Sequence, residues 1–304
     1  MKNRLSTAVL ALFLAVVPAM AGDNDEVAQW RNIGLEKSLG QRWDLGLELE
    51  YRAQDKSRFS TGLEASFKVN KYLKFGAGYS FILNPMEKPE RITDKNDLPD
   101  FPGRAPEFCP DEFTQGYNRF MPYHQPPRHR FVVEGTGSVK LWKWLRISLR
   151  ERYQLTYRKA HSTEKLSHRE KYAKTYDFDF DEDWNVIDIW DVNLEETTDE
   201  WSTKEYKANT DQVLRSRLKL EVDKKKWKVS PFISAEAHNS VTAGDRMLLQ
   251  KIRTAAGATY KFRKRNEISL SYILTFDMYD FDDEEKVRLH DRLHAIDIGY
   301  KYSF

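Results

Sequence analysis

The sequence predicts an all-β protein, a transmembrane antiparallel up-and-down β-barrel of about 10–12 strands with long extracellular loops. Three observations predict it: segments of alternating hydrophobicity through most of the chain, connections that alternate between short and long, and a final segment ending in Phe304. Successive side chains of a strand point to opposite faces, so such alternation gives each strand one face for lipid and one polar face for a lumen.

Residues 1–21 predict a secretory signal peptide. Lys2 and Arg4 precede an apolar run from Leu5 to Val17, and the small-residue pattern Ala19-Met20-Ala21 follows. This order is typical of a cleaved signal with cleavage before residue 22. The apolar run is shorter than the about 20 residues that a membrane-spanning helix needs. We therefore expect export, with residues 22–304 forming the barrel.

The composition excludes a helical membrane protein but is compatible with a β-barrel. Charged residues make up 32% of the chain and the mean hydropathy is −0.71. A barrel tolerates these values because its lumen and loops are polar. The single Cys109 excludes an internal disulfide framework, and the net charge of +2 gives no indication of a nucleic-acid partner.

Residues 41–53 show the strand pattern most clearly, with Leu45, Leu47 and Leu49 alternating with charged residues and Gly46. Similar segments lie near 58–69, 71–82, 129–139, 144–157, 209–222, 227–238, 248–262, 266–280 and 290–304. Residues 27–39 form a further candidate, but their alternation slips between Trp30 and Ile33. Bacterial single-chain barrels usually have an even number of strands. Either 27–39 is not a regular wall strand, or one loop is wrongly delimited.

Tight turns are predicted near residues 40, 70, 141, 224 and 264, and long loops at 83–127 and 158–207. Short periplasmic turns and longer extracellular loops are the usual barrel asymmetry. The proline-rich loop 83–127 suggests an irregular cap or a folded-in lid, and the aromatic residues among the acids of loop 158–207 suggest a hairpin. Aromatic residues flank the short turns, as expected at a membrane interface: Trp43, Tyr72, Trp142, Trp144, Trp227, Tyr260 and Phe262.

The final segment predicts how the barrel is assembled. Ile298, Tyr300, Tyr302 and Phe304 share one face of the last strand. This pattern resembles the C-terminal strand signal read by the outer-membrane assembly machinery. The expected partners are therefore that machinery and the outer-membrane lipids, with an extracellular ligand on the long loops as a further expectation, and the expected location is the cell outer membrane.

Several stretches together resemble an uncharacterised outer-membrane barrel family of Bacteroidota, domain-of-unknown-function family 2490. They are WRNIGLEKSLGQRWDLGLELEYR, FSTGLEASFKVNKYLKFGAGYSF, RHRFVVEGTGSVKLWKWLRISLRERYQ and the terminal IDIGYKYSF. The resemblance covers most of the chain outside the two long loops. It implies a barrel, and it brings no activity and no catalytic residues.

Charged residues on the polar faces are the candidate functional residues. Acids are expected to line the lumen on early strands and bases on later ones: Glu48, Glu50, Glu64, Arg146, Arg150, Arg152, Arg215, Arg217, Lys219, Lys251 and Arg253. If these charges pair across a narrow interior, they plug it, because buried charges need partners. If the bases stay unpaired, they line a narrow path for small anionic solutes.

Two other motifs indicate chemistry only weakly. Asp177, Asp179, Asp181 and Asp188 fall at positions of a calcium-loop template, but Glu182 replaces its glycine. His238 and Ser240 have a spacing seen in outer-membrane phospholipases. The alternation of their strand, however, predicts that both side chains face the lumen and not the lipid. We therefore expect no catalytic residues and no cofactor. A structural or surface-interaction barrel with a plugged lumen is favoured over an anion channel and over a lipid-modifying enzyme.

Overall fold

The computed structural model describes residues 25–53, 57–85, 87–95, 112–180, 186–224, 227–241, 247–263, 265–278 and 289–304. The predicted signal peptide, residues 1–21, and Cys109 lie outside these ranges. The chain forms two compact units, residues 1–86, 126–159 and 208–304 in one and residues 87–125 and 160–207 in the other. Among the described residues, no helix is long and apolar enough to cross a membrane.

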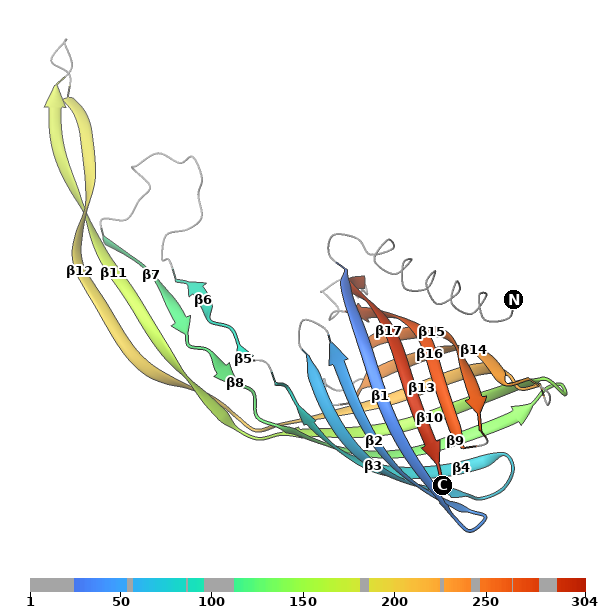
Figure 1. The fold of residues 1–304 in the computed structure, drawn as a ribbon. Helices are drawn as coiled ribbons and strands as arrows, with labels where there is room; N and C mark the ends of the chain where they lie inside the picture. Colours follow the sequence, from blue (N-terminus) through green and yellow to red (C-terminus); the bar gives the residue numbers. More distant parts are fainter. Residues whose placement is uncertain are drawn as a thin grey trace. The chain divides into compact units, whose positions relative to one another are not determined.

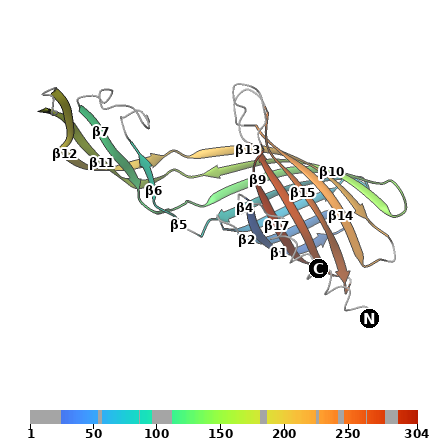
Figure 2. The same ribbon diagram turned by 90° about the horizontal axis from the view of Figure 1, so that it is seen from above.

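The first unit is a closed β-barrel, and its eleven strands confirm the predicted fold class (Figures 1 and 2). Strands that follow one another around most of the wall are antiparallel; β4 pairs directly with β9, and β10 with β13. The strands are β1 (Glu26–Leu39), β2 (Trp43–Ala53), β3 (Arg58–Lys68), β4 (Leu73–Leu83), β9 (Arg128–Lys140), β10 (Leu145–Arg158), β13 (Asn209–Val222), β14 (Val229–Ser240), β15 (Leu248–Phe262), β16 (Asn266–Met278) and β17 (Leu289–Ser303).

The barrel closes by parallel pairing of β1 with β17, which permits an odd number of strands. Residues 27–39 are thus a regular wall strand, and their alternation does not slip. Trp30 is 4% exposed and faces the lumen, whereas Ile33 and Leu35 are exposed on the outer face. The apparent slip in the sequence arises because a large apolar residue, Trp30, occupies a lumen position.

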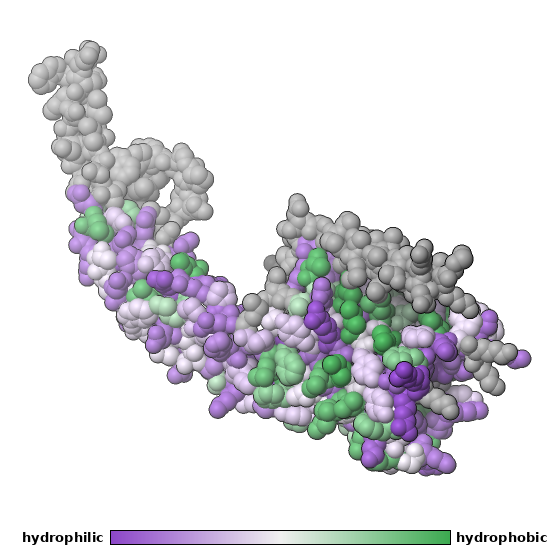
Figure 3. All heavy atoms as spheres, in the orientation of Figure 1, coloured by the Kyte–Doolittle hydropathy of each residue, from purple (hydrophilic) through white to green (hydrophobic). Residues whose placement is uncertain are grey.

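The outer face of the barrel is apolar. Leu35, Leu47 and Leu63 lie side by side on β1, β2 and β3, and Leu63 is 61% exposed. Apolar side chains gather over the barrel strands in the same way in Figure 3. Soluble proteins rarely expose so large an apolar patch, so these leucines indicate a surface that contacts lipid. Exposed aromatic residues flank the short turns, among them Trp43, Tyr72, Trp142 and Trp227.

The second unit is built from the two segments predicted as long loops. Its main sheet has the order β12 (Val186–Tyr206), β11 (His161–Phe180), β7 (Glu112–Phe120) and β6 (Arg91–Asp94). Short strands β5 (Glu87–Lys88) and β8 (Tyr123–His124) pair separately. The segment 158–207 contains the hairpin β11–β12, and β7 joins it at β11. The described part of 83–127 is therefore strand-bearing instead of an irregular cap.

Aromatic pairs explain why β7 adds to the hairpin. Phe113 stacks on Tyr172 with ring centroids 5.3 Å apart, and Tyr117 stacks on His168 at 4.8 Å. Cross-strand aromatic pairs of this kind stabilise strand pairing by about 0.2–1 kcal/mol each. The proline content of the segment concealed this strand, because only the residues without proline, 112–120, form it.

Candidate functional site: a charged network in the barrel lumen

The lumen has one wall rich in glycine and one rich in arginine. Glycines occupy inward positions on β1 to β4, and two of them have acids directly above them. A Cβ on Gly76 would lie 3.0 Å from Cγ of Glu134, and one on Gly78 would lie 3.1 Å from Cγ of Glu64. The glycines therefore leave space for the long charged side chains of the neighbouring strands, Glu64 on β3 and Glu134 on β9.

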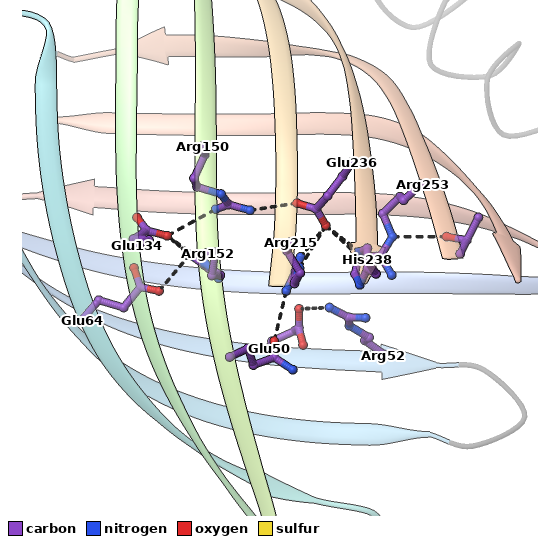
Figure 4. A network of polar contacts seen from close by, with 12 residues as sticks. Glu50, Arg52, Glu64, Glu134, Arg150, Arg152, Arg215, Glu236, His238 and Arg253 are labelled. Atoms are coloured by element: carbon purple, nitrogen blue, oxygen red, sulfur yellow. Dashed lines mark hydrogen bonds and ion pairs between the residues drawn. The ribbon is translucent and has the colours of Figure 1, made fainter. Parts of the chain in front are cut away.

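Glu236 on β14 is the centre of the network and is only 4% exposed (Figure 4). Its carboxylate accepts hydrogen bonds from Arg215 Nη2 at 2.6 Å and Arg150 Nη2 at 2.9 Å. His238 Nε2 lies 2.7 Å from the same carboxylate, and Arg253 Nη1 lies 3.9 Å away. One acid thus joins β10, β13, β14 and β15.

Glu134 on β9 is a second centre. Arg152 approaches its Oε2 with Nη2 at 2.6 Å and Nε at 2.7 Å, and Arg150 Nη1 is 3.7 Å from that oxygen. Arg152 also reaches Glu64 on β3, with Nη2 3.5 Å from Oε1. Arg150 therefore links the two centres, and Arg152 extends the network to the glycine-rich wall.

Glu50 and Trp30 complete the network on that wall. Glu50 on β2 pairs with Arg52 and with Arg58 of β3, each at 2.8 Å. The Trp30 ring on β1 has the guanidinium of Arg52 3.8 Å from its centroid and that of Arg253 4.9 Å away. Cation–π contacts are strongest when the groups are desolvated, as in this interior.

These contacts form a nearly closed circuit around the lumen. It begins at Glu64 on β3, passes through β10, β9, β14 and β15 to Trp30 on β1, and ends through β2 at Arg58, which lies on β3 as Glu64 does. A ring of this kind ties the opposite walls together and fills the interior with charged side chains.

The register places every predicted lumen residue on the inward face, but only some belong to the network. Glu50, Glu64, Arg150, Arg152, Arg215 and Arg253 do. Three bases pair locally: Arg146 with Asp223 at 2.6 Å, Lys219 with Glu221 at 2.8 Å, and Lys251 with Asp277 at 2.9 Å. Glu48 and Arg217 have no ion pair within the described residues.

Sequence reasoning missed the two central acids, Glu134 and Glu236, and also Trp30, Arg52 and Arg58. The inward parity of the four charged residues was readable, because each alternates with outward apolar or small residues, whereas Trp30 lies between Gln29 and Arg31 and gave no such signal. The expectation that early-strand acids pair with late-strand bases holds only for Glu64 with Arg152. Arg215 and Arg253 pair with Glu236 on the adjacent strand β14, Arg150 reaches the same acid across β13, and Lys219 pairs with Glu221 on its own strand.

The calcium-loop interpretation does not fit the backbone. Asp177 and Asp179 lie in β11 opposite Ile189 and Ile187 of β12, and Asp188 lies opposite Phe178. These residues belong to paired strands, whereas a calcium-binding loop needs a turn that wraps around the ion. Asp181 lies outside the described residues. Within the described residues, no group of three or more His, Cys, Asp or Glu is placed to hold a metal.

The phospholipase-like pair lies on the lumen face. His238 is bound to Glu236, and Ser240 is 1% exposed at the end of β14. Lipid substrates contact the outer face of a barrel, so this placement does not suit lipid hydrolysis.

The predicted assembly residues lie on β17 and just beyond it. Ile298 and Tyr300 are exposed on the outer face, and the Tyr300 hydroxyl donates to Asn266 Oδ1 at 2.7 Å. Phe304 is 61% exposed, packs edge-on against Tyr302 at 4.9 Å, and donates its amide to Glu36 O at 2.8 Å.

Comparison with known proteins gives a family and several distant structural matches. No curated protein sequence matches the chain. The chain is similar to the structure "CymD monoaromatic hydrocarbon channel" at 12% identity and a TM-score of 0.32, covering 83% of this chain and 81% of that one. It is also similar to the translocator domain of autotransporter NalP from Neisseria meningitidis, at 10% identity and a TM-score of 0.29, covering 100% and 98%. Residues 28–284 match the family described as "Protein of unknown function (DUF2490)", and the chain therefore belongs to that family.

Proposed function

We propose that this protein is an outer-membrane β-barrel with a plugged lumen that anchors a surface-interaction sheet, made of β6, β7, β11 and β12. The observation that carries the proposal is the nearly closed circuit of contacts around the lumen, centred on Glu236 and Glu134. A barrel of eight strands is just filled by side chains, and one of eleven is only moderately wider. Long arginine side chains that reach acids two or three strands away, Arg150 to Glu236 and Arg152 to Glu64, close it.

Energetics favour a paired and static lumen. A charge removed from water needs a partner, and a buried pair that loses one partner costs about 3–5 kcal/mol. Glu236 has three partners within 3 Å, so opening the lumen at this level would break several charge-assisted hydrogen bonds together. Thermal motion alone does not supply that energy.

The outer-membrane location is part of the proposal. The apolar outer face and its aromatic residues near the short turns support contact with lipid. The predicted signal peptide, the assembly role of the final strand and an origin in Bacteroidota stay predictions. An interaction partner at the cell surface would contact the sheet formed by β11 and its neighbours, which carries exposed Trp201, Leu194 and Ile92.

Conductance in planar bilayers tests the plug. The wild type should show little steady current. Arg150→Ala/Arg152→Ala breaks the circuit at both acid centres and should produce frequent openings. Lys219→Ala is the matched control, because Lys219 pairs locally with Glu221, and it should stay closed. Large, stable openings in the wild type would overturn the plug.

A narrow channel for small anionic solutes is the second candidate. It is favoured by lumen bases without a carboxylate partner among the described residues, Arg217 and Arg130. Wild-type openings selective for chloride over potassium would establish it. The third candidate, a lipid-modifying enzyme, would require lipid hydrolysis that His238→Ala abolishes.

A further inference from the structure

An open pocket of about 440 Å³ lies at the end of the barrel from which the long connections leave. It is lined by residues near the ends of five neighbouring strands: Arg128 of β9, Thr156 and Arg158 of β10, Asn209, Thr210 and Asp211 of β13, Ser240 of β14 and Gln250 of β15. All of these belong to the barrel unit. Pockets of about 300–1,000 Å³ hold small molecules.

Two arginines lie side by side on one wall of this pocket, and neither forms an ion pair within the described residues. Arg128 and Arg158 are direct cross-strand partners. Arg128 donates to the neutral Asn84 Oδ1 at 2.8 Å. Like charges placed directly opposite each other on adjacent strands are destabilising. An arrangement of this kind is favourable when an anion lies between the two guanidinium groups.

A third arginine lies one step deeper. Arg130 Nε donates to Thr156 Oγ1 at 3.4 Å, so this side chain lies directly below the pocket wall. Arg130 lies two residues after Arg128 on the same face of β9, and it has no ion pair within the described residues. The interior therefore carries positive charge from the mouth down to the upper edge of the network.

Polar groups of both kinds surround the arginines. Thr156 and Ser240 supply buried hydroxyls, and Asn209 supplies an amide. Asp211 is the carboxylate among the described lining residues, and it has no ion pair with either arginine. An unpaired carboxylate is a good acceptor for the hydroxyl groups of a ligand, whereas the guanidinium groups suit an oxyanion in bidentate geometry.

We infer that this pocket binds a small hydroxylated oxyanion, a sugar phosphate or a sugar acid. Arg128 and Arg158 bind its phosphate or carboxylate, with Arg130 adding positive charge from below. Asp211, Thr156 and Asn209 bind its hydroxyl groups. The ligand enters from the side of the long connections and stops above the circuit, so that the pocket is a binding site and not a path through the barrel.

Isothermal titration calorimetry with the full-length folded protein in detergent tests this inference. The probes are glucose 6-phosphate, gluconate, inorganic phosphate and uncharged glucose. We expect one of the two hydroxylated anions to bind, with inorganic phosphate weaker and glucose without measurable heat. Binding should weaken as salt rises, since the interaction is electrostatic.

Variants locate the site. Arg128→Gln/Arg158→Gln should weaken binding about 10- to 100-fold, as expected for loss of hydrogen bonds to a charged group. Arg146→Gln is the matched control, because Arg146 lies at the opposite end and pairs with Asp223; it should bind as wild type does. Heat-modifiable migration on gels checks folding, and the single variant Arg158→Gln replaces the double variant if that fails to fold.

The outcomes separate this inference from the proposed plug. Absence of binding by any anion at millimolar concentration, or equal binding by wild type and the arginine variants, overturns the pocket and leaves the plug untouched. Binding with the expected variant effects in a protein that conducts freely supports the pocket and overturns the plug. Tightest binding by inorganic phosphate overturns the assignment to a hydroxylated ligand.

Discussion

Replacing Glu236 by glutamine should destabilise the barrel more than any other isosteric change of a lumen acid. The substitution keeps the size of the side chain and removes its charge. Apart from residue 236 itself, Arg215 then has as its acceptor Gln154 Oε1 at 3.4 Å, and Arg150 has Glu134 Oε2 at 3.7 Å. The guanidinium groups on β10, β13 and β15 would repel one another in a confined space.

The size of the effect follows from burial. Glu236 is 4% exposed and makes three contacts shorter than 3 Å to cationic or protonatable groups. Removing one partner of a buried ion pair costs about 3–5 kcal/mol. Retained hydrogen bonds to the glutamine oxygen recover part of this, so we expect a loss of about 3 kcal/mol in the free energy of unfolding.

Urea unfolding from lipid vesicles, followed by tryptophan fluorescence, measures this loss. Glu267→Gln is the control, because Glu267 forms a longer ion pair of 3.7 Å with the exposed Lys261, and such pairs contribute about 0–1 kcal/mol. If Glu236→Gln and Glu267→Gln unfold at the same urea concentration, the central role of Glu236 is refuted.

Three further predictions concern the outer face, the chain end and the surface sheet. Leu47→Arg should lower barrel stability by about 2–4 kcal/mol in a folding titration, whereas Leu39→Arg, next to the β1–β2 turn, should cost about 0–1 kcal/mol. Deleting Phe304 removes the hydrogen bond from its backbone N–H to Glu36 O of β1 and its ring contact with Tyr302. The deletion should reduce membrane insertion and the heat-modifiable band on gels. Hydrogen bonds to Asp199 and then Glu170 raise the pKa of His168 above 6.5. The protonated ring therefore stabilises the β11–β12 pairing below that pH and stops doing so as pH rises through the raised pKa. As the pH rises through this range, hydrogen exchange of the β11 amides should therefore accelerate by more than the exchange of unprotected amides does over the same pH range.

Each of these has an outcome that contradicts it. Equal stability of the two leucine variants would place Leu47 away from lipid. Unchanged insertion of the truncated chain would remove the role of Phe304. The pH effect should vanish in Asp199→Asn; if it persists there, another group is responsible.

The wall of the barrel was predictable from the sequence because lipid imposes a strict rule. Leu45, Leu47 and Leu49 must all face outward, and the residues between them must face inward. The exception was β1, where the lumen accepts a tryptophan if arginines cover it. Trp30 satisfies this condition through Arg52 and Arg253, which lie far from it in sequence, so no local pattern could reveal it.

The charged members of the lumen network were largely readable from the sequence, but their connections were not. Alternation alone gives the inward parity of Arg150 and Glu236. The up-and-down order, in which β10 pairs with β13 across the long segment 158–207, was also predicted. Alternation does not say which acid an arginine reaches, because that depends on the register between strands and on side-chain length. Arg150 reaches Glu236 across β13, and no pattern within one strand indicates that contact.

The parallel pairing of β1 with β17 gives the wall a line of closure unlike its other joints. Its partners are the two ends of the barrel sequence: Asn32 Nδ2 donates to Asp297 Oδ1 at 2.9 Å across 265 positions. Contacts so distant in sequence cost the most chain entropy, and parallel ladders are slightly weaker per residue than antiparallel ones. The wall can be completed only after the last strand has arrived, and under heat or mechanical load it should part first along this line. A disulfide introduced between β1 and β17 would keep the barrel closed. Reduction of that disulfide would allow the two strands to separate again.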